Sequence, residues 1–188
     1  MTELVLPDPC LVVLVGAAGS GKSTFAARHF APDETLSSDA YRAAIAGDPA
    51  NQAANGAAFK ALHRSLDRRL QAGALTVVDA TNVTMPARRA LVAIAGRASL
   101  PSIAIVLDVA PAVVLARNAA RPDRVVPEAV VRRHLAELRT VVDRRAFEAD
   151  GFASIVILDD PVAIESIAVR RERRADRDQV DPDRADAD

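Results

Sequence analysis

The chain has 188 residues, which suits a single α/β domain, and aromatic residues make up only 3% of it, so the core must consist mainly of Val, Leu, Ile and Ala. The formal net charge of −1 excludes a basic field over the whole surface, so any nucleic acid would have to bind at a local patch. A single cysteine, Cys10, excludes an intramolecular disulfide, and without a transmembrane-length apolar run or a signal-peptide pattern we expect a cytoplasmic protein with no membrane contact.

Short apolar runs alternate with helical patterns along the chain. The run Leu11–Val15 ends at a glycine and is typical of a buried parallel strand. Further strands are predicted at Thr35–Ser38, Leu75–Val78, Ile103–Leu107 and Ser154–Leu158. Helices are predicted from Lys22 to about His29, from near Tyr41 to Gly47, over Ala53–Ala72, over Pro86–Ala95, from Pro111, over Pro127–Asp150, and from Val162 to about Arg174.

This alternation predicts an α/β fold of the P-loop kinase kind, with a doubly wound, mostly parallel five-stranded sheet flanked by helices. We expect the domain to cover residues 1–174. The last residues, 175–188, are charged and have no apolar period, so they are expected to form a disordered tail.

Residues 16–24, GAAGSGKST, match the phosphate-binding pattern G-x-x-x-x-G-K-[ST] between a predicted strand and a predicted helix. The glycines let backbone N–H groups face a phosphate, and the helix adds the positive end of its dipole. Lys22 would reach the β- and γ-phosphates of ATP, and the Ser23 hydroxyl would bind Mg²⁺. The predicted ATP-binding residues of this loop are Gly16, Ala18, Gly19, Ser20, Gly21, Lys22, Ser23 and Thr24. The motif alone does not distinguish a kinase from an ATPase or a GTPase.

Three aspartates follow predicted strands, and ligands of open parallel sheets bind beyond the carboxyl ends of the strands. Asp39 could be a general base for an acceptor hydroxyl, or it could cap the helix that begins near Tyr41. Asp79 ends the run LTVVD and could hold the Mg²⁺ shell, or it could be a hydrogen-bonded strand end. Asp108 has no further support and is interpreted as structural.

Residues 117–126 are rich in arginine, and we predict that they form a lid. Arg117 and Arg121 are four residues apart and therefore lie on one helical face. In a phosphotransferase, such arginines offset charge on the transferring phosphoryl group and exclude water. We predict that both bind ATP. The alternative is a solvated arginine face.

Five segments in a fixed order resemble the 5′-kinase domain of bacterial and phage polynucleotide kinases, in particular the P-loop kinase module of polynucleotide kinase-phosphatase RNA-repair enzymes. They are GAAGSGKSTFAARHF, LSSDAYR, NGAAF, GALTVVDATNVTMPARRAL and ARNAARPDRVV. The resemblance implies transfer of the ATP γ-phosphate to the 5′-hydroxyl end of RNA or DNA, with ATP and Mg²⁺ as cofactors.

The resemblance also implies roles for single residues. Asp39 would be the general base for the 5′-hydroxyl, Arg42 would contact the phosphate next to that hydroxyl, and Gln52 would lie on the acceptor side. Lys22 and Arg117 would be catalytic because they offset charge on the equatorial oxygens.

Relatives continue into phosphatase and ligase modules, whereas this sequence stops where a phosphatase module would begin. We therefore expect a stand-alone kinase or an excised domain, with separate phosphatase or ligase repair proteins and a homodimer as candidate partners. Two other functions stay open: a small-molecule kinase acting on a sugar or an antibiotic, and a non-catalytic nucleotide-binding switch. Arg42 distinguishes a polynucleotide acceptor from a sugar, because a neutral sugar does not need a cation beside the reacting hydroxyl.

Overall fold

The structure is a computed structural model that describes residues 3–48, 51–121, 125–143 and 146–173. Its main sheet has five parallel strands in the order β3-β4-β2-β5-β6. Their bounds are β2 Leu11–Val15, β3 Thr35–Ser37, β4 Thr76–Asp79, β5 Ser102–Leu107 and β6 Ser154–Leu158. The predicted fold class and the number of strands in the main sheet are confirmed.

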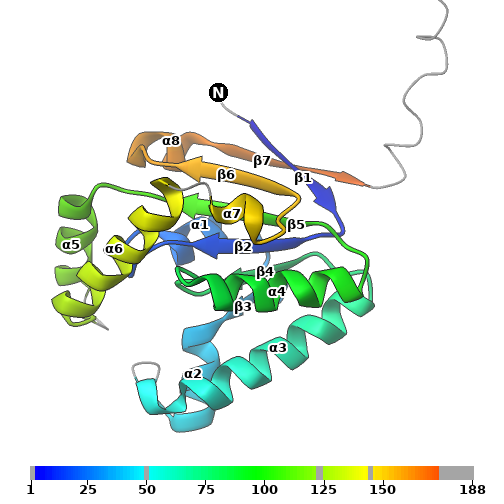
Figure 1. Ribbon diagram of the computed structural model, residues 1–188, viewed down its shortest axis with the longest axis horizontal. Helices are drawn as coiled ribbons and strands as arrows, with labels where there is room; N and C mark the ends of the chain where they lie inside the picture. Colours follow the sequence, from blue (N-terminus) through cyan, green and yellow to red (C-terminus); the bar gives the residue numbers. More distant parts are fainter. Residues whose placement is uncertain (1–2, 49–50, 122–124, 144–145, 174–188) are drawn as a thin grey trace, which may run out of the picture.

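Helices cover both faces of this sheet (Figure 1). They are α1 Lys22–His29, α2 Ser38–Ala46, α3 Asn55–Gln71, α4 Met85–Arg97, α5 Pro111–Ala119, α6 Glu128–Asp143, α7 Ala146–Ala149 and α8 Pro161–Ser166. Short 3-10 turns lie at Pro32–Glu34 and Gln52–Ala54. None of the helices within the described ranges has the length and apolar character needed to cross a bilayer.

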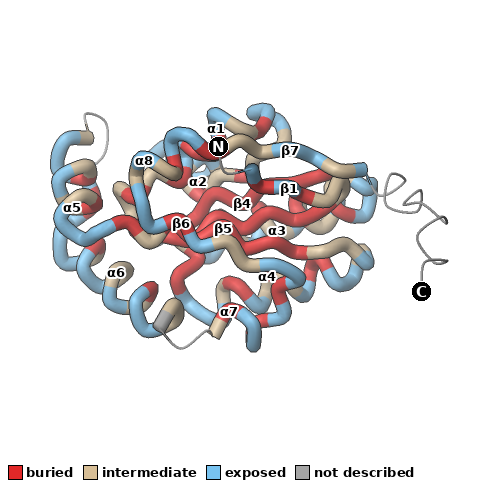
Figure 2. The backbone as a smooth tube through the Cα atoms, turned by 90° about the horizontal axis from the view of Figure 1, so that it is seen from above, coloured by how far each residue is buried: buried red, intermediate tan, exposed pale blue. Residues whose placement is uncertain are grey.

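Alternate residues of the central strand β2 point into two separate cores. Val12 and Leu14 pack in the core that contains Phe25 of α1. Leu11 and Val13 pack in the other core, with leucines of α3 and α4. Because both faces of the strand are buried, its sequence is continuously apolar rather than alternating. In Figure 2 the buried residues gather along the middle of the molecule, where β4 and β5 run.

The predicted final helix, Val162 to about Arg174, is wrong. The helix α8 ends at Ser166, and Ala168–Arg173 forms a strand, β7, that pairs in parallel with β1, Glu3–Asp8. Arginine has a good helix propensity, but the ladder with β1 and the ion pairs that β7 makes outweigh this local preference. The strand β1 was not predicted, because its proline is unusual within a strand.

Several helix boundaries also differ from the prediction: α3 begins at Asn55 rather than Ala53, and α4 extends to Arg97 rather than Ala95. The expected helix Pro127–Asp150 is divided into α6 and α7, and residues 144–145 between them lie outside the described part. The helix α2 begins at Ser38, earlier than Tyr41, because the Ser37 hydroxyl accepts a hydrogen bond from the Ala40 amide and caps it. Residues 122–124 of the predicted lid and the predicted tail 175–188 also lie outside the described residues.

Candidate active site

A cavity of about 600 Å³ opens at the edge of the sheet where the parallel strands end. Its walls come from α1, α2, α3, α5, α6, α8 and the end of β4. Figure 1 shows α5 and α6 at the end of the sheet toward which the arrows of β2 and β5 point. This is the edge at which open parallel sheets bind their ligands.

The glycine-rich loop between β2 and α1 is packed tightly against α5. Gly19 has a φ of +89°, and a Cβ placed there would lie 2.6 Å from the Val114 carbonyl oxygen. Gly21 has a φ of +99° and is the N-cap of α1. Gly19 is therefore favoured by both its close contact and its backbone conformation, and Gly21 by its backbone conformation. Within the described structure no side chain caps α1, which suits a helix N-terminus that receives a phosphate.

Lys22 is buried, with 8% of its surface exposed. Its Nζ donates hydrogen bonds to the carbonyl oxygens of Gly16 at 2.9 Å and Ala17 at 2.7 Å. Burial lowers its pKa to about 8, although the nearby carboxylates of Asp79 and Asp39 oppose this shift. The Lys22 side chain therefore loses its proton, and with it its positive charge, in mildly alkaline solution.

Ser23 and Asp79 form a pair that could hold a metal ion. The Ser23 hydroxyl donates to Asp79 Oδ2 at 2.7 Å, and Asp79 is buried at the end of β4. Mg²⁺ prefers such oxygen ligands, and it takes its remaining ligands from substrate phosphates and water. Groups of three or more His, Cys, Asp or Glu that could bind a metal do not occur in the described part of the chain, and a Mg²⁺ site at a phosphate loop does not need one. The pair therefore fits Mg²⁺.

At another part of the cavity wall, α2 presents Asp39 and Arg42. They are one helical turn apart and form an ion pair. Arg42 also donates from Nη1 to Asn55 Oδ1 at 3.0 Å. The Arg42 side chain is only 7% exposed, whereas the Asp39 side chain is 38% exposed, so the carboxylate is the accessible member. Ser37, not Asp39, is the residue that caps α2.

Both predicted arginines line the same cavity, but Arg121 lies beyond the end of α5 at Ala119, so the two do not share a helical face as predicted. Arg117 lies near the phosphate loop, with Nη1 3.8 Å from where a Gly21 Cβ would be, and its Nη2 is 3.8 Å from Glu165 Oε1. Arg121 lies close enough to Lys22 for its charge to lower the pKa of that lysine. Since residues 122–124 are not described, a lid that closes over the site stays a prediction.

The position of Gln52 is only partly defined. Its backbone belongs to the Gln52–Ala54 turn, and its side chain lies outside what the structure describes. Its place on the acceptor side therefore stays a prediction.

Sequence reasoning missed one wall of the cavity. Val130, Arg133 and His134 of α6 line it, and their spacing of three and four residues puts them on one helical face. His134 Nδ1 is buried and has no hydrogen-bond partner in the described structure. Burial lowers the His134 pKa, Glu137 raises it, and the charges of Arg133 and Lys22 lower it further. The helical spacing was visible in the sequence, but nothing there showed which face of α6 meets the phosphate loop.

The central strand, the glycine-rich loop and the helix that follows define a nucleotide-binding P-loop domain with the fold of P-loop kinases. The model of the AAA domain family matches residues 11–145, and the chain belongs to that family. None of the curated proteins matches the sequence.

Solved structures with this fold have different names and contexts. A chain of the Pnkp1/Rnl/Hen1 RNA repair complex matches with a TM-score of 0.63 and 21% identity over 74% of this chain, which spans only 47% of that chain. A sugar kinase from Janibacter sp. HTCC2649 matches with a TM-score of 0.58 and 21% identity over 83% of this chain and 90% of its own. Kti12 from Chaetomium thermophilum, in complex with ADP-AlF3, has a TM-score of 0.53 and 20% identity over 82% and 93%. These likenesses concern the fold alone.

Proposed function

We propose that the protein is a polynucleotide 5′-hydroxyl kinase that transfers the γ-phosphoryl group of ATP to the 5′-hydroxyl end of RNA or DNA. The observation that carries this proposal is that a single cavity is lined both by the phosphate loop and by the Asp39–Arg42 pair of α2. A donor site and a candidate base therefore border the same space, which phosphoryl transfer requires.

The donor end would hold ATP with the loop amides and the start of α1 around the phosphates. Lys22 would exchange its bonds to the loop carbonyls for bonds to phosphate oxygens. Ser23 and Asp79 would hold Mg²⁺, which when bound supplies positive charge to the phosphates. Arg117, at the edge of the loop, would offset charge on the transferring group.

The acceptor end of the cavity would take up the proton of the acceptor hydroxyl and bind the phosphodiester next to it. The acceptor oxygen would attack the γ-phosphorus while the bond from that phosphorus to the ADP oxygen breaks, and the proton would move to the Asp39 carboxylate. Arg42 would bind the phosphodiester that follows the terminal nucleoside. Its contacts with Asp39 and Asn55 fix the guanidinium in place for this role.

A small-molecule kinase would use the same donor residues, and the likeness to a sugar kinase covers most of that chain. We favour the polynucleotide acceptor because a buried arginine next to the candidate base suits an anionic acceptor better than a neutral sugar. A non-catalytic switch would not need the carboxylate beside the cation.

Separate ligase or phosphatase repair proteins are proposed as partners, since a chain with this fold belongs to an RNA repair complex. A homodimer and a cytoplasmic location remain part of the proposal.

The acceptor class is tested by transfer of label from [γ-³²P]ATP·Mg²⁺ to matched acceptors. We expect label on a 5′-hydroxyl oligonucleotide and none on the same oligonucleotide with a 5′-phosphate or on a monosaccharide. Transfer to the oligonucleotide should weaken as salt rises, because it depends on phosphate contacts. Label on the monosaccharide with none on the oligonucleotide would replace this proposal by the small-molecule one.

A further inference from the structure

The segment after β4, residues 80–83, connects the proposed metal end of the site to α4. It belongs to the motif VVDATN, of which the proposed mechanism uses only Asp79. Apart from the half-buried Thr81, the remaining residues of the motif are buried, and one of them has an unusual backbone conformation: Asn82 is 3% exposed and has a φ of +49°. Such a conformation is uncommon in residues other than glycine, and asparagine is among those that adopt it most readily.

Asn82 ties this segment to the strand that leads into the phosphate loop. Its Nδ2 donates to the Leu14 carbonyl oxygen at 2.8 Å and to the Ala80 carbonyl oxygen at 3.4 Å. One residue earlier, the Thr81 carbonyl oxygen accepts from the Gly16 amide at 3.0 Å. The segment therefore holds the end of β2 and the first glycine of the loop through hydrogen bonds.

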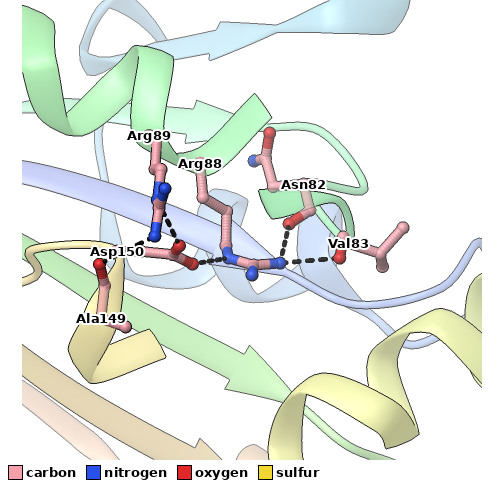
Figure 3. A network of polar contacts seen from close by, with 6 residues as sticks. All are labelled: Asn82, Val83, Arg88, Arg89, Ala149 and Asp150. Carbon is pink, nitrogen blue, oxygen red and sulfur yellow. Dashed lines mark hydrogen bonds and ion pairs between the residues drawn. The ribbon is translucent and has the colours of Figure 1, made fainter. Parts of the chain in front are cut away.

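The other side of the segment is held by Arg88, which is wholly buried (Figure 3). Its Nη1 donates to the carbonyl oxygens of Val83 at 2.7 Å and Asn82 at 3.3 Å. Its Nε donates to Asp150 Oδ2 at 2.7 Å, and the guanidinium lies 4.5 Å from the centre of the Phe147 ring. One side chain thus joins α4, the segment after β4, and the turn that follows α7.

Stability alone is a poor explanation for this arrangement. Burying an ion pair brings a large desolvation cost, and well-packed apolar residues are often at least as stabilising. Asp150 also has a second cation, because Arg89 Nε lies 3.1 Å from its Oδ1. Arg89 is half exposed and, as Figure 3 shows, contacts Asp150 and the Ala149 carbonyl oxygen without reaching residues 82–83. What Arg88 adds is a planar guanidinium whose Nε is held by Asp150 while its Nη1 donates to two successive carbonyl groups.

We propose that Arg88 is a positioning residue for the nucleotide site. By fixing the carbonyl groups of Asn82 and Val83, it keeps Asp79 opposite Ser23 and the Thr81 carbonyl on the Gly16 amide. The proposal rests on the proposed nucleotide and Mg²⁺ site, and it does not depend on which acceptor is phosphorylated.

The matched substitutions Arg88→Lys and Arg89→Lys test this role. Both keep a positive charge near Asp150, but only Arg88→Lys removes the guanidinium whose Nη1 donates to the Asn82 and Val83 carbonyl oxygens while Nε is held by Asp150. In the nucleotide-free protein, we expect the Gly16 amide to exchange with deuterium faster in Arg88→Lys and at the wild-type rate in Arg89→Lys. We also expect a change in the factor by which Mg²⁺ lowers the Kd of a fluorescent ATP analogue. This factor should fall about tenfold in Arg88→Lys and stay at the wild-type value in Arg89→Lys, the size of effect that is typical when a residue supporting a metal ligand is lost.

A second variant keeps the proposal testable if Arg88→Lys does not fold. Asn82→Gly tolerates the positive φ and removes the side-chain bonds to the Leu14 and Ala80 carbonyl oxygens, so it should show the same faster exchange at Gly16. The proposal is wrong if both lysine variants lower the melting temperature equally while exchange at Gly16 and the effect of Mg²⁺ match the wild type. Absence of transfer to oligonucleotides, with these binding results intact, would instead count against the proposed acceptor.

Discussion

At the scale of single residues, the charge of Lys22 depends on where the fold places it. The ammonium group is buried on the loop carbonyls, and burial lowers its pKa to about 8. In the unfolded chain its pKa would be near 10.5, so folding is disfavoured by this group below pH 8, and the penalty disappears as the pH rises from 8 to 10.5. A phosphate bound beside it has the opposite preference, because it stabilises the protonated form.

Nucleotide affinity should therefore fall as the pH rises through about 8. Between pH 8 and the higher pKa that Lys22 has when phosphate is bound, we expect the Kd of ADP to rise by up to about tenfold per pH unit. Isothermal titration between pH 7 and 9.5 measures this directly. Lys22→Met should bind more weakly and show no such dependence, and a wild-type Kd that is constant across this range would contradict the assignment.

At the scale of elements, the contact between the phosphate loop and α5 sets the shape of the site. Gly19→Ala would place a Cβ 2.6 Å from the Val114 carbonyl oxygen, at a φ of +89°. We expect the loop to move away from α5 and nucleotide binding to be lost, with stability reduced by about 1–3 kcal/mol.

Gly73→Ala is the matched control for this substitution. Gly73 also has a positive φ, +69°, but no atom lies within 4 Å of the Cβ that would be added. It should cost about 1–2 kcal/mol through backbone conformation alone and leave nucleotide binding unchanged. Equal nucleotide affinity in the two variants, measured with the same fluorescent ATP analogue, would show that the contact with α5 does not shape the loop.

The elements also show what local sequence could predict. The bounds of β2, α1 and β6 agree with the prediction, because a continuous apolar run or a glycine-rich turn marks them in the sequence. The strand β7 was predicted as a helix, because its pairing partner is more than 160 residues away and its own residues favour a helix. The place of Asp39 beside Arg42 follows from helical spacing, whereas the face of α6 that carries His134 is decided by packing across the cavity.

At the scale of the whole molecule, the two-stranded sheet joins the beginning of the chain to its last described strand. Leu6 of β1 is 0% exposed and belongs to the same core as Phe25 behind the phosphate loop. The small sheet therefore continues the core of the domain, and we do not regard it as a separate unit.

Leu6→Ala should for this reason destabilise the entire domain, by about 2–5 kcal/mol. Urea denaturation followed by far-ultraviolet circular dichroism and by release of a bound fluorescent nucleotide should show one shared, lowered midpoint. Val5→Ala, at a neighbouring position that is 37% exposed, should change stability by less than about 1 kcal/mol. Separate midpoints for the two signals in Leu6→Ala would mean that β1 and β7 unfold independently of the nucleotide site.

The measurement that tests the central claim most directly is single-turnover transfer of the γ-phosphoryl group from ATP·Mg²⁺ to a 5′-hydroxyl oligonucleotide, with wild type and Asp39→Asn compared at equal nucleotide occupancy. The substitution keeps the size of the side chain and removes the carboxylate that would accept the proton. We predict that the wild type labels the oligonucleotide and that Asp39→Asn is slower by about 10²–10⁴, the contribution of a general base. Transfer by Asp39→Asn at the wild-type rate would contradict the claim that this part of the cavity activates the acceptor hydroxyl.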